Sequence, residues 1–152
     1  MGGSQDGQAG AMPLDHGGLE ILDTEECRSL LATTPLGRIV FTDRALPAVQ
    51  PVNYVLADGD VVIRTSPASR LATAAGDAVV AFEIDDFDTA SRTGWSVVVI
   101  GRARAATGSA ELAALRALPL RSWAPGDHDH FIRIHPQLIS GRRIPDYSAP
   151  AV

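Results

Sequence analysis

The side chains best suited to binding an anionic group gather in one short segment of the sequence, residues 64–70. They are Arg64, Thr65, Ser66, Ser69 and Arg70. Arginine can hold two phosphate oxygens at once, and hydroxyl groups can donate further hydrogen bonds to the same phosphate. We expect Ser66 to cap a short helix that starts at Pro67, because the N–H groups of a helix start also favour phosphate. The alternative is a capped surface helix with two solvated arginines.

A second cluster that could do chemistry is His128-Asp129-His130. Two histidines around an aspartate can bind a metal ion, and histidine is a common haem ligand. Because the cluster follows Pro125-Gly126, we favour a polar loop before the last strand and predict no metal site. No Ser-His-Asp set and no paired carboxylates point to a hydrolase, so the sequence assigns no catalytic residue.

Composition limits the functions that are open to the chain. Its 152 residues fit one domain, and a hydrophobic fraction of 45% is sufficient for a core. A net charge of −5 argues against sequence-independent binding of nucleic acid, which needs a basic face. No apolar run reaches the roughly 18 residues of a membrane helix, and the N-terminus has no signal-peptide pattern. We expect a cytoplasmic protein that binds neither nucleic acid nor membranes.

The pattern along the chain predicts a disordered tail over 1–18, one folded domain over 19–146 and a C-terminal tail over 147–152. Strands are expected where β-branched and apolar residues run together, over 37–42, 49–56, 60–65, 77–84, 96–106 and 130–140.

Short helices should separate some of these strands. Asp23 should cap a first helix, in which the single cysteine, Cys27, is buried, and Ser109 should cap the last one. The acidic run 85–88 is expected to be a solvated loop.

Hairpin signals give the strands an antiparallel order. Asp58-Gly59 between two apolar runs predicts a tight turn, because both turn positions need positive φ. Pro51 cannot donate to a strand partner, so we expect it at an edge or a bulge. Short strands, hairpins and brief helices together indicate an antiparallel barrel or sandwich.

Several segments, taken in order, resemble the flavin-binding half of the pyridoxamine 5′-phosphate oxidase-like family. They are Gln50-Pro51-Val52-Asn53-Tyr54, the Asp58-Gly59 hairpin, Arg64-Thr65-Ser66 with Arg70-Leu71, the run from Gly94-Trp95-Ser96 to Ala103, and Ile139-Ser140-Gly141-Arg142-Arg143. The resemblance covers residues 19–144. It implies a mainly β protein with a few short helices, folded as an antiparallel split β-barrel of six or so strands. It also implies a homodimer with two FMN molecules at the subunit interface.

The resemblance further implies which residues contact the cofactor. Those that hold the ribityl phosphate are Arg64, Thr65, Ser66 and Arg70, with Ser69 beside them. The backbone of Pro51, Val52 and Asn53 lies along the isoalloxazine edge, and Trp95 and Ser96 lie near the cofactor. Arg142 approaches the flavin from the second subunit.

We therefore expect an FMN-binding oxidoreductase that acts on a small organic substrate by electron or hydride transfer. Oxidation of pyridoxamine phosphate itself is not expected, because the additional basic and aromatic residues for that substrate cannot be located. One alternative is a reductase that uses the deazaflavin F420, with a basic groove formed by Arg102, Arg104, Arg142 and Arg143. Another is a protein that binds flavin or haem without turnover. The substrate and the electron donor stay open.

Overall fold

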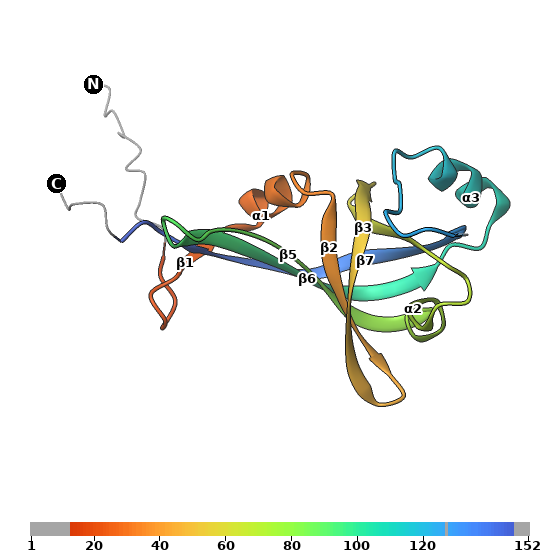
Figure 1. Cartoon of the computed structure of the whole chain (residues 1–152), viewed down its shortest axis with the longest axis horizontal. Helices are drawn as coiled ribbons and strands as arrows, with labels where there is room; N and C mark the ends of the chain where they lie inside the picture. Colours follow the sequence, from red (N-terminus) through yellow and green to blue (C-terminus); the bar gives the residue numbers. More distant parts are fainter. Residues whose placement is uncertain (1–12, 127, 148–152) are drawn as a thin grey trace, which may run out of the picture.

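The computed structural model describes residues 13–126 and 128–147, and the greater part of both expected tails, 1–12 and 148–152, lies outside the described residues. The described chain is mainly antiparallel β-structure with three short helices (Figure 1). In chain order the elements are β1 (Glu20–Leu22), α1 (Thr24–Leu31), β2 (Leu36–Asp43), β3 (Leu46–Ala57), β4 (Asp60–Thr65), α2 (Arg70–Ala74), β5 (Asp77–Asp88), β6 (Thr93–Ala105), α3 (Ser109–Arg116) and β7 (His130–Ile144). None of the described helices is long and apolar enough to cross a membrane.

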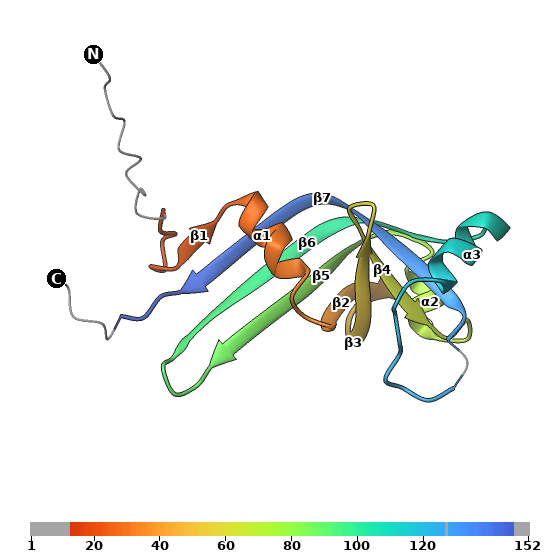
Figure 2. The same cartoon turned by 90° about the horizontal axis from the view of Figure 1, so that it is seen from above.

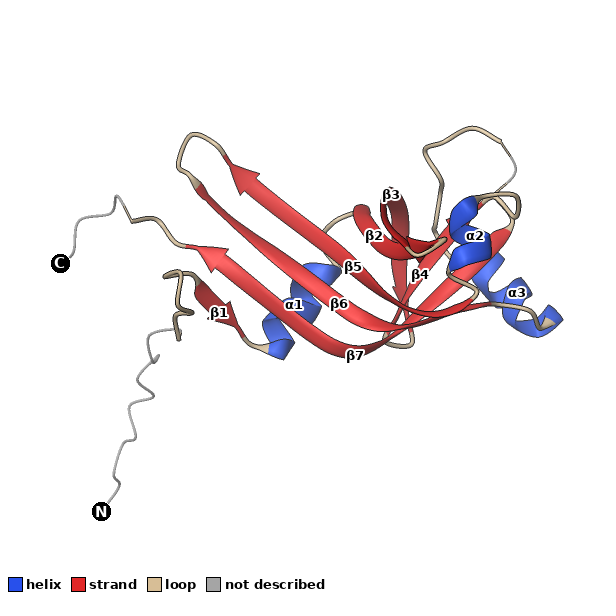
Figure 3. Cartoon of the chain, turned by 90° about the horizontal axis from the view of Figure 1, so that it is seen from below, coloured by secondary structure: helices blue, strands red, loops and turns tan. Residues whose placement is uncertain are grey.

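Six strands form a closed barrel in the order β7-β4-β3-β2-β5-β6 and back to β7, and β1 pairs with the far end of β7. The pairing is uneven, since β5 and β6 pair over twelve residues each but β2 and β5 over only three. β5, β6 and β7 therefore continue together beyond the barrel as a long extension (Figure 2 and Figure 3). We call this extension, residues 84–97 and 139–144, the ribbon. The arrangement confirms the predicted split β-barrel, with seven strands in the sheet.

The barrel interior contains the main hydrophobic core. Alternate side chains of its strands point inward, and Ile39, Phe82 and Ile132 are fully buried there. A second, smaller cluster lies outside the barrel, where Phe131 of β7 packs with Leu115 of α3. The position of α3 thus restricts where the described chain after it, residues 117–126 and 128–129, can run.

A β-bulge in β7 explains why the last strand alternates imperfectly in the sequence. The register with β6 shifts between Ile100 and Gly101, so Gln137 is an extra residue on β7. Before the bulge, Ile134 points into the barrel. After it the phase is reversed, and Leu138 faces outward with 65% of its surface exposed.

The hairpin and the edge position were predicted correctly. Asp58 and Gly59 have φ of 53° and 81°, and they connect β3 to β4. Pro51 pairs with Arg38 of β2, but pairing between β3 and β4 begins only at Tyr54. Pro51 therefore has a strand neighbour on one side, where its missing N–H group is tolerated.

The helix expected from Pro67 starts later, and the prediction that Ser66 caps it is wrong. α2 begins at Arg70, and the Ser69 hydroxyl caps it by accepting the Ala72 N–H at 3.0 Å. Ser66 opens a turn instead, in which its carbonyl accepts the Ser69 N–H at 3.0 Å. The fixed φ of proline suits the second position of such a turn as well as the first position of a helix.

Two further expectations are wrong. Gly108, not Ser109, takes the cap position of α3, and it makes no side-chain hydrogen bond there. The acidic run 85–88 is not a loop, because it extends β5 and pairs with residues 93–96 of β6. The neighbouring strand supplies backbone partners that outweigh the poor strand propensity of aspartate.

The first helix agrees with its prediction. Asp23 caps α1, since its carboxylate accepts the Glu26 N–H at 2.8 Å. Cys27 is fully buried against β7, and a Cβ at Gly141 would lie only 2.6 Å from its sulfur. Burial raises the pKa of the Cys27 thiol, as befits a packing residue.

The described part of the expected N-terminal tail, residues 13–18, forms a hydrogen-bonded turn. The Asp15 carboxylate accepts the N–H groups of Gly17 at 2.8 Å and Leu19 at 2.9 Å. The same carboxylate pairs with Arg142 of β7 at 3.1 Å. These contacts fasten the turn to the end of the ribbon.

Candidate functional site

A cavity of about 300 Å³ opens between β3, β4 and the 117–129 loop, which joins α3 to β7. We call it the Arg64 cavity. The predicted cofactor residues that line it are Pro51, Val52, Asn53, Arg64 and Thr65. The other lining residues are Leu36, Gln50, Ser122, Trp123, Ala124 and His128. None of these residues carries a carboxylate, so the described lining is positive in charge.

The hairpin explains how the two strands open this cavity. Pairing of β3 with β4 starts at Tyr54 and Ile63. Asn53 and Arg64 are the next residues on the two strands, at the point where pairing has ended. The side chains at this junction can therefore turn toward a ligand.

Arg64 is half-buried and held from two sides. Its Nε donates to the His128 carbonyl at 2.6 Å, and its guanidinium carbon lies 5.1 Å from the ring centroid of Phe131. Guanidinium has five N–H donors, and the described residues of the chain occupy only one of them. The terminal nitrogens of Arg64 remain available to an anion in the cavity.

Asn53 joins the strand to the 117–129 loop. Its side-chain oxygen accepts the Trp123 N–H at 2.9 Å, and its side-chain nitrogen donates to the Pro35 carbonyl at 3.3 Å. The Asn53 side chain is buried, so these bonds are shielded from competing water. The backbone of Trp123 is thereby fixed, while its indole stays 69% exposed at the mouth of the cavity.

His128 contributes an unsatisfied polar atom to the cavity wall. Its Nε2 lies 3.0 Å from the Pro125 carbonyl, whereas its Nδ1 is buried and has no hydrogen-bond partner among residues 13–126 and 128–147. A carbonyl only accepts, so Nε2 carries the hydrogen and neutral His128 presents Nδ1 as an acceptor. Buried polar atoms of this kind are rare unless a ligand or water pairs with them.

The other predicted phosphate residues adjoin the cavity through α2. The Thr65 and Ser69 hydroxyls lie 3.1 Å apart, with Ser66 between them along the chain. Arg70 does not line the cavity, and it pairs with Asp43 at 3.3 Å with 76% of its side chain exposed. Of the two predicted arginines, the structure places Arg64 in the cavity wall and Arg70 outside it, and their roles in cofactor binding stay predictions.

The remaining predicted residues, Trp95, Ser96 and Arg142, lie elsewhere. They belong to the ribbon, where Ser96 and Arg142 are opposite one another on β6 and β7. Trp95 packs against the core and lines a second cavity of about 600 Å³, which we call the ribbon cavity. A single chain does not bring this group to the Arg64 cavity.

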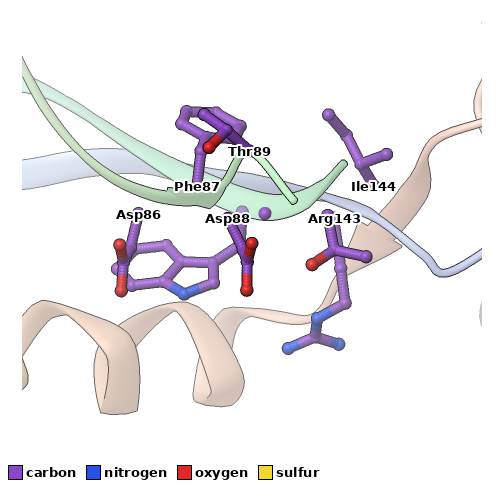
Figure 4. A pocket seen from close by; sticks show the side chains of 9 residues that line it. Asp86, Phe87, Asp88, Thr89, Arg143 and Ile144 are labelled. Atoms are coloured by element: carbon purple, nitrogen blue, oxygen red, sulfur yellow. The ribbon is translucent and has the colours of Figure 1, made fainter. Parts of the chain in front are cut away.

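The ribbon cavity has a mixed, mainly acidic lining. Asp86, Asp88 and Arg143 project to one side of the ribbon, and Phe87 and Ile144 project to the other (Figure 4). This alternation is that of an extended strand and confirms that the acidic run is part of the sheet.

The four arginines expected to form one basic groove do not form it. Arg102 and Arg104 lie in the barrel half of β6, where they pair with Asp77 at 3.0 Å and Glu111 at 2.8 Å. Arg142 and Arg143 lie at the end of the ribbon. Their carboxylate partners are Asp15, Glu20 and Glu26.

The aspartate of the His128-Asp129-His130 cluster has another partner. Both Asp129 oxygens accept from Arg116, at 2.9 and 2.8 Å, and this arginine lowers the pKa of the Asp129 carboxyl. Within residues 13–126 and 128–147, no three side chains of the metal-binding types cluster in a way that could hold an ion. The cluster is thus a loop end fastened to α3.

The sequence patterns did not predict that the 117–129 loop lines the cavity. The available signal was a tryptophan, Trp123, in a segment of prolines, glycine and polar residues, where an apolar ring has no obvious core position. His128 was noticed, but only as a loop residue. Its place beside Arg64 depends on residues far away in the chain.

Comparison with known proteins is consistent with this geometry. The model of the pyridoxamine 5′-phosphate oxidase family matches residues 23–143. The uncharacterized protein Rv0080 of Mycobacterium tuberculosis is 41% identical over 128 residues, which cover 81% of this chain and 84% of that protein.

Solved structures give the same result. The FAD binding protein from Mycobacterium smegmatis matches with a TM-score of 0.68 and 37% identity, over 81% of this chain and 95% of that chain. A conserved protein from Corynebacterium diphtheriae matches with a TM-score of 0.67 and 32% identity, over 82% of this chain and 96% of that chain. By its sequence match and its split barrel, the chain belongs to the pyridoxamine 5′-phosphate oxidase-like family.

Proposed function

We propose that this protein is a flavin-dependent oxidoreductase that binds FMN at the Arg64 cavity and acts on a small organic molecule. The observation that carries the proposal is the meeting of Pro51, Asn53, Arg64 and Thr65 in one cavity without a carboxylate. The arginine and nearby hydroxyls suit a phosphate, and the apolar strand edge suits a flat ring. The unpartnered Nδ1 of His128 suits a polar edge of the same ligand.

The cavity suits the part of the cofactor that FMN and FAD have in common. A relative at 37% identity is named as an FAD binding protein, and FAD contains all of FMN. At about 300 Å³ the cavity is at the lower end of ligand pockets, which range over roughly 300–1,000 Å³. This volume suits the ring, with the rest of the cofactor running along α2.

A bound flavin would supply the redox chemistry, and the protein would supply position and charge. Arg64 would hold the anionic end, and the 117–129 loop would keep water from the ring. Nδ1 of His128 would accept a hydrogen bond from a donor group on the isoalloxazine ring or on the ribityl chain of the flavin. None of these roles needs a nucleophile or an acid–base pair.

We also propose that two copies pair through the outer face of the barrel. A row of apolar side chains crosses this face on five adjacent strands, and Val49 and Leu138 at its ends are 62% and 65% exposed. The row consists of Val49, Val40, Ala81, Ile100 and Leu138, each paired with the next. An exposed apolar row of this length favours an interface, and a two-fold pairing would cover both copies.

The same face supports a cofactor site shared by two subunits. Ser96 lies four residues before Ile100, and Arg142 lies four residues after Leu138, so all four side chains point outward. A partner on this face would carry its Ser96 and Arg142 toward the other copy. Two-sided binding would account for a cavity that is too small for the whole cofactor.

The test of cofactor binding is a spectroscopic titration of the purified protein with FMN, FAD and F420. We expect flavin to bind, and the double variant Arg64→Ala, Arg70→Ala to lose it while its circular dichroism spectrum stays that of the wild type. Preference for F420 would support the deazaflavin alternative instead. Unchanged flavin affinity in the double variant would disprove the assignment of the Arg64 cavity. Tight flavin binding with no reoxidation by any acceptor would favour a non-catalytic carrier.

The test of the dimer is the mass in solution. Leu138→Asp places a charge in the apolar row, at a side chain that the single chain leaves exposed. We expect a dimer for the wild type and a monomer for the variant by light scattering. A wild-type monomer at high concentration would contradict the proposed pairing.

A further inference from the structure

A second, smaller cavity adjoins the Arg64 cavity. It measures about 230 Å³, and its lining residues are Pro35, Asn53, Pro119, Arg121 and Trp123. We call it the Arg121 cavity. Asn53 and Trp123 line both cavities, so a molecule in one would lie beside a molecule in the other.

The walls of the Arg121 cavity are held in place by one buried side chain. Asn53 accepts the Trp123 N–H and donates to the Pro35 carbonyl, at 2.9 and 3.3 Å. Pro35 and Pro119 restrict the backbone further, because their φ angles are fixed. The cavity is therefore formed before any ligand arrives, which lowers the entropy cost of binding.

Charge distinguishes Arg121 from most arginines of the molecule. Within the described chain, no carboxylate lies within ion-pair distance of Arg121, and its cavity lining contains none. Arg64 shares this property, whereas the arginines that line the ribbon cavity and the cavity beside Asp60 are each paired with a carboxylate; they are Arg102, Arg104, Arg133 and Arg143. In a chain of net charge −5, an unpaired arginine in a preformed cavity is suited to an anion.

Trp123 gives the cavity a flat aromatic wall. The residue is 69% exposed, although its backbone N–H is held by Asn53. An aromatic ring held in this way can stack on a conjugated ligand at little cost in conformational entropy. Arg121 and Trp123 together match a planar molecule with an anionic group at one end.

We propose that the Arg121 cavity is the substrate site and that the substrate is a small conjugated carboxylate or similar planar anion. Its anionic group pairs with Arg121, and its conjugated part lies against Trp123, next to the ring in the Arg64 cavity. The volume of about 230 Å³ admits a single ring with short substituents. This inference rests on the proposed flavin function of the neighbouring cavity.

The experiment uses benzoate and its neutral counterpart benzamide as probes of the flavin-loaded protein. Binding is followed by the change in the absorption spectrum of the flavin, in wild type, Arg121→Gln and Arg28→Gln. Arg28 is an exposed arginine of α1, so its variant is a control for the loss of one positive charge. We expect benzoate to bind the wild type and the control equally and Arg121→Gln at least tenfold more weakly, with flavin affinity unchanged.

Benzamide should bind weakly, and its affinity should be the same in the wild type and in Arg121→Gln. Equal affinity for the two probes, equal benzoate affinity in Arg121→Gln, or no benzoate binding at all would overturn the proposal. If the wild type takes up no flavin, the proposed function fails separately. The substrate site is then tested in the flavin-free protein by quenching of indole fluorescence, which benzoate should cause in the wild type and not in Arg121→Gln.

Discussion

The barrel and the ribbon each present an open cavity, but their arginines are used in opposite ways. In the barrel, Arg64 donates to a backbone carbonyl and keeps its terminal nitrogens available, and the described lining has no carboxylate. In the ribbon, Arg143 pairs with Glu20 and Glu26, and Asp86 and Asp88 line the same cavity. Of these two arginines, only Arg64 is therefore left to attract an anion within the single chain.

The difference follows from where the carboxylates come from. The partners of Arg143 lie on β1 and α1, which cover the end of the ribbon. The Arg64 cavity is covered by the 117–129 loop, whose described residues turn the Asp129 carboxylate to Arg116. The segments that cover a cavity thus set its charge. Four predictions follow from the difference between the Arg64 cavity in the barrel and the cavity in the ribbon.

The largest effect is expected from Arg64. Arg64→Ala removes a charged donor and the anchor of the His128 carbonyl, and charged hydrogen bonds contribute about 1.5–3 kcal/mol each. We expect flavin affinity to fall roughly 100-fold, measured by equilibrium titration. Arg102→Ala, which breaks only an exposed pair with Asp77, should change it less than twofold. Equal losses in the two variants would remove the distinction between paired and unpaired arginines.

A smaller effect is expected from the loop. Trp123→Ala should weaken flavin binding about tenfold, because the indole forms part of the cavity wall, while Trp123→Phe keeps an aromatic face and most of the affinity. The same titration measures both variants. A flavin affinity that is unchanged in Trp123→Ala would show that the loop does not contact the ring.

A still smaller effect is expected from Arg70. It is 76% exposed and pairs with Asp43, so Arg70→Ala should weaken flavin binding only two- to fivefold, as is typical of exposed ion pairs. Asp43→Asn releases Arg70 and should leave affinity equal or slightly higher. A loss in Arg70→Ala as great as that in Arg64→Ala would mean that the cofactor draws Arg70 away from Asp43.

Glu83, where β5 passes from the barrel to the ribbon, should affect the stability of the fold and leave flavin affinity unchanged. Burial, together with the neighbouring carboxyl of Asp85, raises the pKa of Glu83 to about 7. Arg38 opposes this rise, at 3.4 Å from Glu83 and 2.8 Å from Asp85, but does not cancel it. The folded protein therefore binds a proton that the unfolded chain releases near its ordinary pKa of 4.5.

Stability should consequently fall as pH rises from about 4.5 through 7. With 29% of the Glu83 side chain exposed, we expect a loss of about 1–2 kcal/mol between pH 5 and pH 8. Glu83→Gln should remove this dependence in urea unfolding at the two pH values. A pH dependence that persists in the variant would assign it to another group.

The sequence by itself determined the local features of this protein. The Asp58-Gly59 turn and the Asp23 cap each depend on residues close together in the chain, and each was predicted correctly. The burial of Cys27 was also predicted correctly, although β7, which covers it, is distant in the chain. The hairpin likewise delivers Arg64 to the strand end at the cavity, while its role in cofactor binding stays a prediction. The choice between Ser66 and Ser69 as the helix cap was wrong because both are good caps, and the turn at Pro67 decided between them.

Only the tertiary structure decided the charge and the walls of the cavity. Trp123 is fixed by Asn53, which lies 70 residues earlier, and Arg64 holds the carbonyl of His128, which lies 64 residues later. Arg143 is neutralised by Glu26, 117 residues away. Ion pairs and loop contacts of this length have no signature in local sequence, because they exist only once the barrel closes and brings distant segments together.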